Sequence, residues 1–221
     1  MRIICHLTFF SRSRNRPRST PSLIYLCLLF IIVSGTLYLY ASSLKQSLLI
    51  GNFIISILAA LSVIVVGLFD LFPMITPENQ VHLGILFRIL LDYALFAFLL
   101  NFIHEMVKDI ETVDGDYNSG IKTVTVVLGR GRTSKIVLVL TASTTVYFSF
   151  YIFEYYFNNN LYLSTLYCLL TVIAPLVFFC IQLSNAKTAT AFKSLRLILK
   201  VVLLFGVFSV LINSLNILYN A

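Results

Sequence analysis

Long apolar runs, each of roughly 20 residues, take up most of this 221-residue chain. A helix needs about 20 apolar residues to cross the ~30 Å hydrocarbon core of a membrane, and within that core only helices and closed barrels satisfy their backbone hydrogen bonds. The pattern therefore predicts an all-α fold, a polytopic bundle of about six transmembrane helices. The runs cover residues 23–41, 48–72, 81–103, 136–153, 161–181 and 195–218.

The composition excludes an ordinary soluble protein. Apolar residues make up 59% of the chain and charged residues 11%, whereas charged residues are about a quarter of a soluble domain. The net charge is +7, but no nucleic-acid-binding motif accompanies it. We therefore interpret the basic residues as determinants of orientation in the bilayer. The prediction is an integral, multi-pass membrane protein in contact with lipid, with no nucleic acid as partner.

The chain divides into a basic N-terminal tail, residues 1–22, and a transmembrane domain, residues 23–221. Arginines in the tail alternate with Ser, Asn and Pro, a composition that favours an exposed arm over a helix. They are Arg12, Arg14, Arg16 and Arg18.

Acidic residues are concentrated in one stretch, residues 104–122, which reads HEMVKDIETVDGDYNSGIK. Its first thirteen positions hold five of the nine acidic residues in the chain. We interpret the stretch as an active-site loop between two spans. If it is helical instead, Asp109, Thr112 and Asp116 share one face. Carboxylates at this spacing suit Mg²⁺, which proteins often hold with one or two carboxylates together with substrate phosphates.

Basic residues in and after the acidic stretch add positive charge that can hold a diphosphate. They are Lys108, Lys122 and Arg130. The composition alone is equally compatible with a solvated connection between spans that carries no chemistry.

Two charged residues lie inside the third apolar run. Arg88 and Asp92 are four residues apart, so on a helix they would face each other. Two interpretations stay open, a structural ion pair inside the bundle and a polar contact that lines a substrate cavity.

The order of residues in the acidic stretch, KDIExxDGDxxxGIKT, resembles the second aspartate-rich motif of the UbiA superfamily of intramembrane prenyltransferases. The resemblance is strongest to the branch that contains geranylgeranylglycerol-phosphate geranylgeranyltransferases. Two flanking segments, SLKQSLLIGN at 43–52 and TVVLGRGRTSK at 125–135, are also similar to that family. The similarity extends from about residue 41 to the C-terminus.

The resemblance implies a nine-helix bundle with two aspartate-rich cytoplasmic loops, which bind Mg²⁺ and together grip one isoprenyl diphosphate. It implies transfer of a polyprenyl group, geranylgeranyl in this branch, to a membrane-accessible acceptor that is either a lipid precursor or an aromatic ring. By matching to the motif, the metal ligands are Asp109 and Asp116, with Lys108 as a further catalytic residue. The diphosphate-binding residues are Lys108, Lys122 and Arg130, and Asn52 lies near the substrate cavity. Arg88 and Asp92 join it in the interpretation as cavity-lining residues.

The sequence departs from the family pattern at two places. Thr112 stands where the first carboxylate of the motif is expected, and a hydroxyl is a poorer Mg²⁺ ligand than a carboxylate. No Asp or Glu occurs before Asp70, so the first aspartate-rich motif is absent. We expect an incomplete N-terminus. The alternative is a non-catalytic membrane protein, either an inactive relative that binds prenyl lipids or a small transporter.

The expected orientation of the chain in the membrane also favours an incomplete N-terminus. With the acidic stretch on the cytoplasmic side, most basic residues outside the tail are cytoplasmic, in agreement with the positive-inside tendency. The arginine-rich tail then lies on the opposite side, because three spans separate it from the acidic stretch. Either three additional spans before residue 23 reverse the side of the N-terminus, or the first apolar run does not span the membrane.

We predict little or no prenyl transfer by this chain alone, because the carboxylates of the first motif are missing. The measurement is transfer of radiolabelled geranylgeranyl diphosphate by the purified protein in the presence of Mg²⁺. Robust Mg²⁺-dependent transfer that the Asp116→Ala substitution abolishes would contradict this prediction.

Overall fold

The structure, a computed structural model, describes residues 27–28, 30–36, 38, 49–71 and 74–220. The chain divides into two compact units, Met1–Leu39 and Tyr40–Ala221. The described residues of the first unit are helical. The predicted basic tail, about half of the first apolar run and the larger part of the SLKQSLLIGN segment lie outside the described residues.

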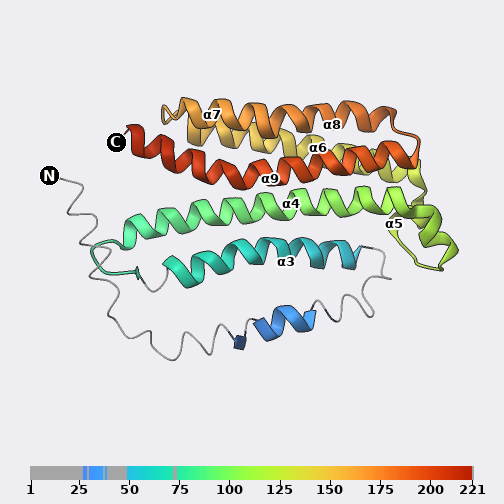
Figure 1. Cartoon of the computed structure of the whole chain (residues 1–221), viewed down its shortest axis with the longest axis horizontal. Helices are drawn as coiled ribbons and strands as arrows, with labels where there is room; N and C mark the ends of the chain where they lie inside the picture. The colour runs from blue at the N-terminus through green and yellow to red at the C-terminus, as the bar shows by residue number, and fades with distance from the viewer. Residues whose placement is uncertain (1–26, 29, 37, 39–48, 72–73, 221) are drawn as a thin grey trace. The chain divides into compact units, whose positions relative to one another are not determined.

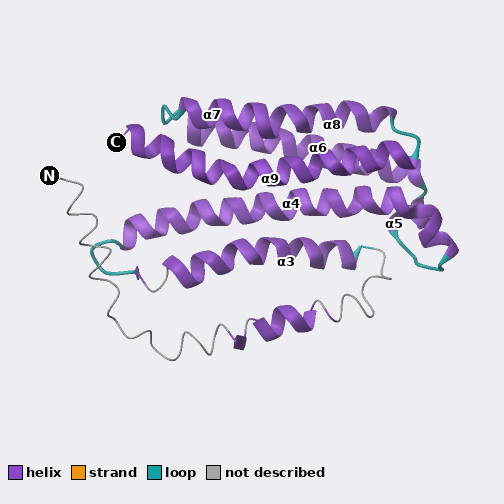
Figure 2. Cartoon of the chain, viewed as in Figure 1, coloured by secondary structure: helices purple, strands orange, loops and turns teal. Residues whose placement is uncertain are grey.

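The second unit is helical throughout its described elements, as Figure 2 shows. In chain order the elements are α3 (Ile50–Val66), the π-helical turn η3 (Gly67–Leu71), α4 (Gln80–Asn118), α5 (Val124–Leu128), α6 (Arg130–Ile152), η5 (Phe153–Phe157), α7 (Tyr162–Cys168), η6 (Leu169–Ile173), α8 (Ala174–Asn185) and α9 (Ala189–Asn220).

Five helices of the described residues are long and apolar enough to cross a membrane, which confirms the predicted all-α transmembrane bundle. They are Ile50–Leu71, Gln80–Asn118, Arg130–Phe157, Tyr162–Asn185 and Ala189–Asn213. They correspond to the second to sixth predicted spans. The first predicted span, residues 23–41, lies only in part within the described residues.

The fourth of these helices contains a proline. Pro175 follows the π-helical turn η6, which joins α7 to α8 without a break in the span. Proline has no N–H to donate and its ring clashes with the preceding turn, so a locally wider turn is a common way to keep such a helix continuous.

Helix α4 is central to the second unit because it packs against α3, α6 and α9 (Figure 1). The core lies among α4, α6, α8 and α9. Its fully buried apolar side chains include Ile103, Val107, Ile110, Val137, Leu176, Phe179, Leu195, Leu199 and Val202.

The acidic stretch is part of α4 and not a loop. Helix α4 runs without interruption for 39 residues, which corresponds to about 58 Å. Its apolar part, residues 81–103, accounts for about 34 Å and is sufficient to cross the hydrocarbon core. Residues 104–118 therefore extend the same helix beyond the apolar layer, and the prediction of a loop is wrong for these residues.

Helix α4 ends in a Schellman motif. The N–H of Ile121 donates to the carbonyl of Asp116 at 2.9 Å, and the N–H of Gly120 donates to the carbonyl of Tyr117 at 3.2 Å. Gly120 has φ +70°, the left-handed conformation that this motif requires and that glycine adopts without strain.

Substitution of Gly120 by alanine should lower the free energy of unfolding by about 1 kcal/mol, because a Cβ is unfavourable at positive φ. The measurement is thermal denaturation in detergent followed by circular dichroism. Gly115 is the control, since it lies inside α4 with open space around its Cα, so Gly115→Ala should stabilise the helix by up to about 1 kcal/mol. Equal effects of the two substitutions would contradict the assignment.

Candidate active site on helix α4

Three of the five carboxylates at the end of α4 are neutralised by basic side chains. Two of the partners come from distant elements. Glu111 forms an ion pair with Arg196 on α9 at 3.1 Å. Asp114 forms one with Arg130, the first residue of α6, at 2.7 Å.

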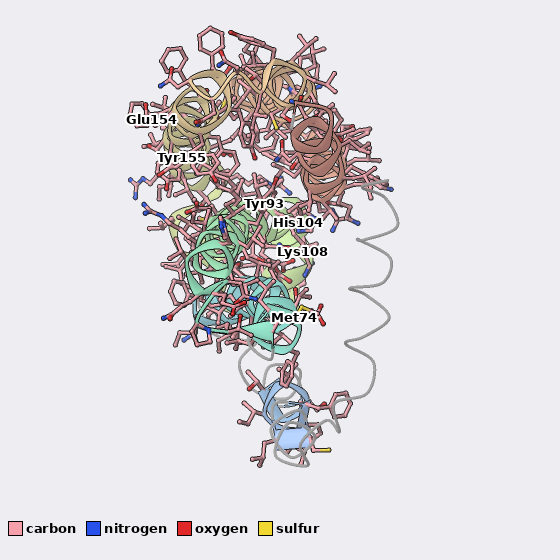
Figure 3. The ribbon with its side chains drawn as sticks, turned by 90° about the vertical axis from the view of Figure 1, so that its left-hand side faces the viewer. Met74, Tyr93, His104, Lys108, Glu154 and Tyr155 are labelled. Atoms are coloured by element: carbon pink, nitrogen blue, oxygen red, sulfur yellow. The ribbon has the colours of Figure 1, made fainter. Side chains whose placement is uncertain are left out.

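The third carboxylate, Glu105, is paired within α4. It lies 2.8 Å from Lys108 Nζ and 3.3 Å from His104 Nδ1. Figure 3 shows His104 and Lys108 on the same side of α4 as Tyr93. Their spacings of 11 and 15 residues from Tyr93 are close to three and four whole turns, which explains the shared side.

The other two carboxylates, Asp109 and Asp116, are in none of the ion pairs found among the described residues. Asp109 Oδ2 accepts a 2.6 Å hydrogen bond from Asn52 Nδ2, which belongs to the first turn of α3. Asp116 Oδ2 lies 3.0 Å from the hydroxyl of Thr112. The predicted shared face of Asp109, Thr112 and Asp116 is therefore present, and Asn52 adjoins it from a second helix.

The environment of Asp109 disfavours its ionised form. Burial raises the pKa of Asp109 to about 6, the hydrogen bond from Asn52 opposes the rise, and the negative charges of Asp116 and Glu105 add to it. A cation placed on this face would offset the repulsion between Asp109 and Asp116.

The face fits a metal ion only in part. Within the described residues, no three His, Cys, Asp or Glu side chains converge on one point. Asp109 and Asp116 are two turns apart, about 10 Å along the helix. Mg²⁺ is commonly held by one or two carboxylates plus substrate phosphates. The residues present therefore fit a half-site that substrate oxygens would complete.

The predicted diphosphate-binding residues are not all on this face. Lys108 is bound to Glu105 on the neighbouring face, and Lys122 is exposed in the connection that follows α4. Arg130 contacts Asp114 and, through Nε, the carbonyl of Ile110 at 3.5 Å.

Of the two interpretations of Arg88 and Asp92, the ion pair is wrong, and the polar contact that lines a substrate cavity stays a prediction. Asp92 Oδ2 accepts a hydrogen bond from Tyr151 on α6 at 3.1 Å, and Arg88 is exposed. The rotation of α4 directs Asp92 towards α6, so the neighbouring helix supplies its partner.

The sequence of this chain matches the model of the UbiA prenyltransferase family over residues 19–216. The chain belongs to the UbiA prenyltransferase family. The resemblance of the acidic stretch to a UbiA motif is thereby confirmed at the level of the family, and no solved structure matches the chain.

Curated relatives of this UbiA family member carry the name digeranylgeranylglyceryl phosphate synthase. The protein of Methanosphaera stadtmanae is 28% identical over 70% of this chain and 47% of its own length. That of Sulfurisphaera tokodaii is 30% identical over 76% and 56%, and that of Saccharolobus solfataricus is 27% identical over 87% and 62%. The chain spans about half to three fifths of the length of these relatives.

Two features of the charged end of α4 were not predictable from the sequence. The partners of Glu111 and Asp114 are 85 and 16 residues away, and no motif connects them. Asn52, in contrast, was predicted near the substrate cavity, and the structure assigns it a direct contact with Asp109.

Replacement of Asn52 by leucine should lower the free energy of unfolding by about 1–3 kcal/mol, because Asp109 would lose its donor while staying largely buried. The measurement is thermal denaturation in detergent without Mg²⁺. Asn101 is the matched control, since its amide donates only to the carbonyl of Ala97 on the same helix. If Asn101→Leu costs as much as Asn52→Leu, the contact between α3 and α4 is not important for stability.

Proposed function

We propose that the face formed by Asp109, Thr112 and Asp116 is one half of the Mg²⁺-dependent diphosphate site of a UbiA-type prenyl transfer. One observation carries the proposal. Asp109 and Asp116 are the two carboxylates of the acidic stretch that take no part in the ion pairs of the described residues, and they are also the two that match the family's metal-binding positions.

The chemistry of each residue follows from its position. Mg²⁺, when bound, would offset the negative charge that develops on a leaving diphosphate. Asn52 orients Asp109 through its 2.6 Å hydrogen bond. Lys108 and Lys122 add positive charge near the end of α4 and favour approach of a polyanion. The apolar part of α4, which ends before residue 104, and the helices around it would shield a reactive allylic cation from water.

The proposed substrates are a polyprenyl diphosphate, with geranylgeranyl as the transferred group, and a membrane-accessible acceptor. A glycerol-phosphate lipid precursor is the first choice because the relatives are named digeranylgeranylglyceryl phosphate synthases, and an aromatic ring is the second. The proposal places the protein in isoprenoid lipid biosynthesis, with the charged end of α4 on the cytoplasmic side.

Binding of geranylgeranyl diphosphate, measured with and without Mg²⁺ on the purified full chain, tests the half-site. We expect Asp116→Asn to weaken the Mg²⁺-dependent part of binding at least tenfold, because a carboxylate ligand is lost. Thr112→Asp should strengthen it about tenfold, because it restores a carboxylate to the same face.

The control is Glu154→Gln, which removes an exposed carboxylate from η5. It should leave Mg²⁺-dependent binding unchanged. Binding that does not depend on Mg²⁺, or that responds equally to Asp116→Asn and Glu154→Gln, would refute the proposed site.

A further inference from the structure

A cavity with both polar and apolar lining lies beside the end of α4, on the side of α5 and α6. Its volume is about 470 Å³. We refer to it as the α5–α6 pocket. Its polar lining comes from α4, α5 and α6 and includes Asp114, Asn118, Thr125, Gly129 and Arg130.

The α5–α6 pocket is separate from the proposed Mg²⁺ half-site. Successive residues of an α-helix are about 100° apart. Asp114 is therefore about 140° around α4 from Asp109 and about 160° from Asp116. A ligand in the α5–α6 pocket would lie against a different face of the helix.

A buried hydroxyl in the pocket has no hydrogen-bond partner. Thr125 is 0% exposed, it lines the pocket, and its Oγ1 has no partner in the described part of the chain. A buried hydroxyl without a partner is unfavourable, so such groups usually bond to protein, water or a ligand. Thr125 therefore indicates a missing acceptor or donor at this position.

The N-terminus of α6 opens into the same pocket. This 23-residue helix has Gly129 as its N-cap residue, without a side-chain cap and without an acidic residue in its first turn. Uncapped N–H groups and the helix dipole both favour an anion there. Gly129 has φ +82°, and Gly131 has open space where a Cβ would lie, so the backbone is accessible at close range.

The charges at this helix end are also favourable for an anion. Arg130 and Arg132 lie in the first turn of α6. Their positive charges are unfavourable beside the positive end of the helix dipole, and a bound anion would offset both. Arg130 is paired with Asp114, whose side chain is 78% exposed. An exposed ion pair of this kind contributes little and can be exchanged for another anion.

We propose that the α5–α6 pocket binds a phosphate group, held by the N-terminus of α6, the Arg130 guanidinium and the Thr125 hydroxyl. The phosphate belongs either to the headgroup of an anionic phospholipid or to a free phosphate, since the pocket lies at the end of α4 that extends beyond the apolar layer. Positive-inside orientation accounts for the arginines alone, whereas it accounts neither for the buried hydroxyl without a partner nor for the uncapped helix.

Thr125→Val is the decisive variant, because it removes the hydroxyl and keeps the shape of the side chain. If Thr125 is only a core residue, the substitution should leave phosphate binding unchanged. Its thermal stability should stay the same or rise, since no hydrogen bond is lost. If the proposal is right, thermal stability is kept while binding of inorganic phosphate weakens about five- to tenfold. Arg130→Gln should weaken binding at least tenfold, and Asp114→Asn should strengthen it several-fold by removing the competing carboxylate.

Binding is measured on the full chain in uncharged detergent without Mg²⁺, by equilibrium dialysis of radiolabelled inorganic phosphate at constant ionic strength. In a second arm the protein is reconstituted in nanodiscs of phosphatidylcholine with or without phosphatidylglycerol, and retained lipid is identified by native mass spectrometry. Loss of retained phosphatidylglycerol in Thr125→Val and Arg130→Gln identifies the lipid as the source, whereas an effect confined to the dialysis arm identifies free phosphate.

Two controls separate this site from its surroundings. Asp116→Asn should leave phosphate binding unchanged, so failure of the Mg²⁺ half-site and failure of the phosphate site are distinguishable. Arg132→Gln should weaken binding much less than Arg130→Gln. Equal losses for the two arginines, or unchanged binding in Thr125→Val, would overturn the proposal, because phosphate would then be attracted by diffuse positive charge only.

Discussion

The length of α4 is the constraint on which the rest of the second unit depends. An uninterrupted helix of 39 residues is almost twice as long as the hydrocarbon layer is thick. One part can therefore cross the apolar layer while the other part carries charge beyond it. Because both halves belong to one rigid element, the packing of Ile103, Val107 and Ile110 also determines which way each carboxylate points.

Packing explains why carboxylates close together in the sequence have different environments. Residues of an α-helix that are two positions apart lie about 160° apart around its axis and face different neighbours. Glu111 is directed to Arg196 on α9 and Asp114 to Arg130 on α6, so both charges are paired with side chains of other helices. Asp109 meets the amide of Asn52, which orients the carboxylate without neutralising it. Asp109 and Asp116 thus stay outside the ion pairs of the described residues, whereas the other faces of the helix are occupied by such pairs.

The sequence predicted what depends on one helix at a time. Apolar runs predicted the spans in the described residues, and helical spacing predicted that Asp109, Thr112 and Asp116 share a face. The same spacing rule failed for Arg88 and Asp92, because Tyr151 from another helix accommodates the carboxylate. Contacts between helices depend on rotation and depth, which spacing within one helix does not determine. The lack of a partner for Thr125 is likewise a property of packing and leaves no signal in the sequence.

The backbone after α4 connects the face that carries Asp116 to the α5–α6 pocket that contains Thr125. The carbonyl of Asp116 accepts the Schellman hydrogen bond from Ile121, and two residues later the Thr123 hydroxyl caps α5 by accepting from the N–H of Val126. Thr125 follows in the first turn of α5. Asp116 and Thr125 are therefore only nine residues apart, and hydrogen-bonded turns connect them. A change in the end of α4 at Gly120 would reach both faces at once, whereas changes to the side chain of Asp116 or of Thr125 act on one face alone.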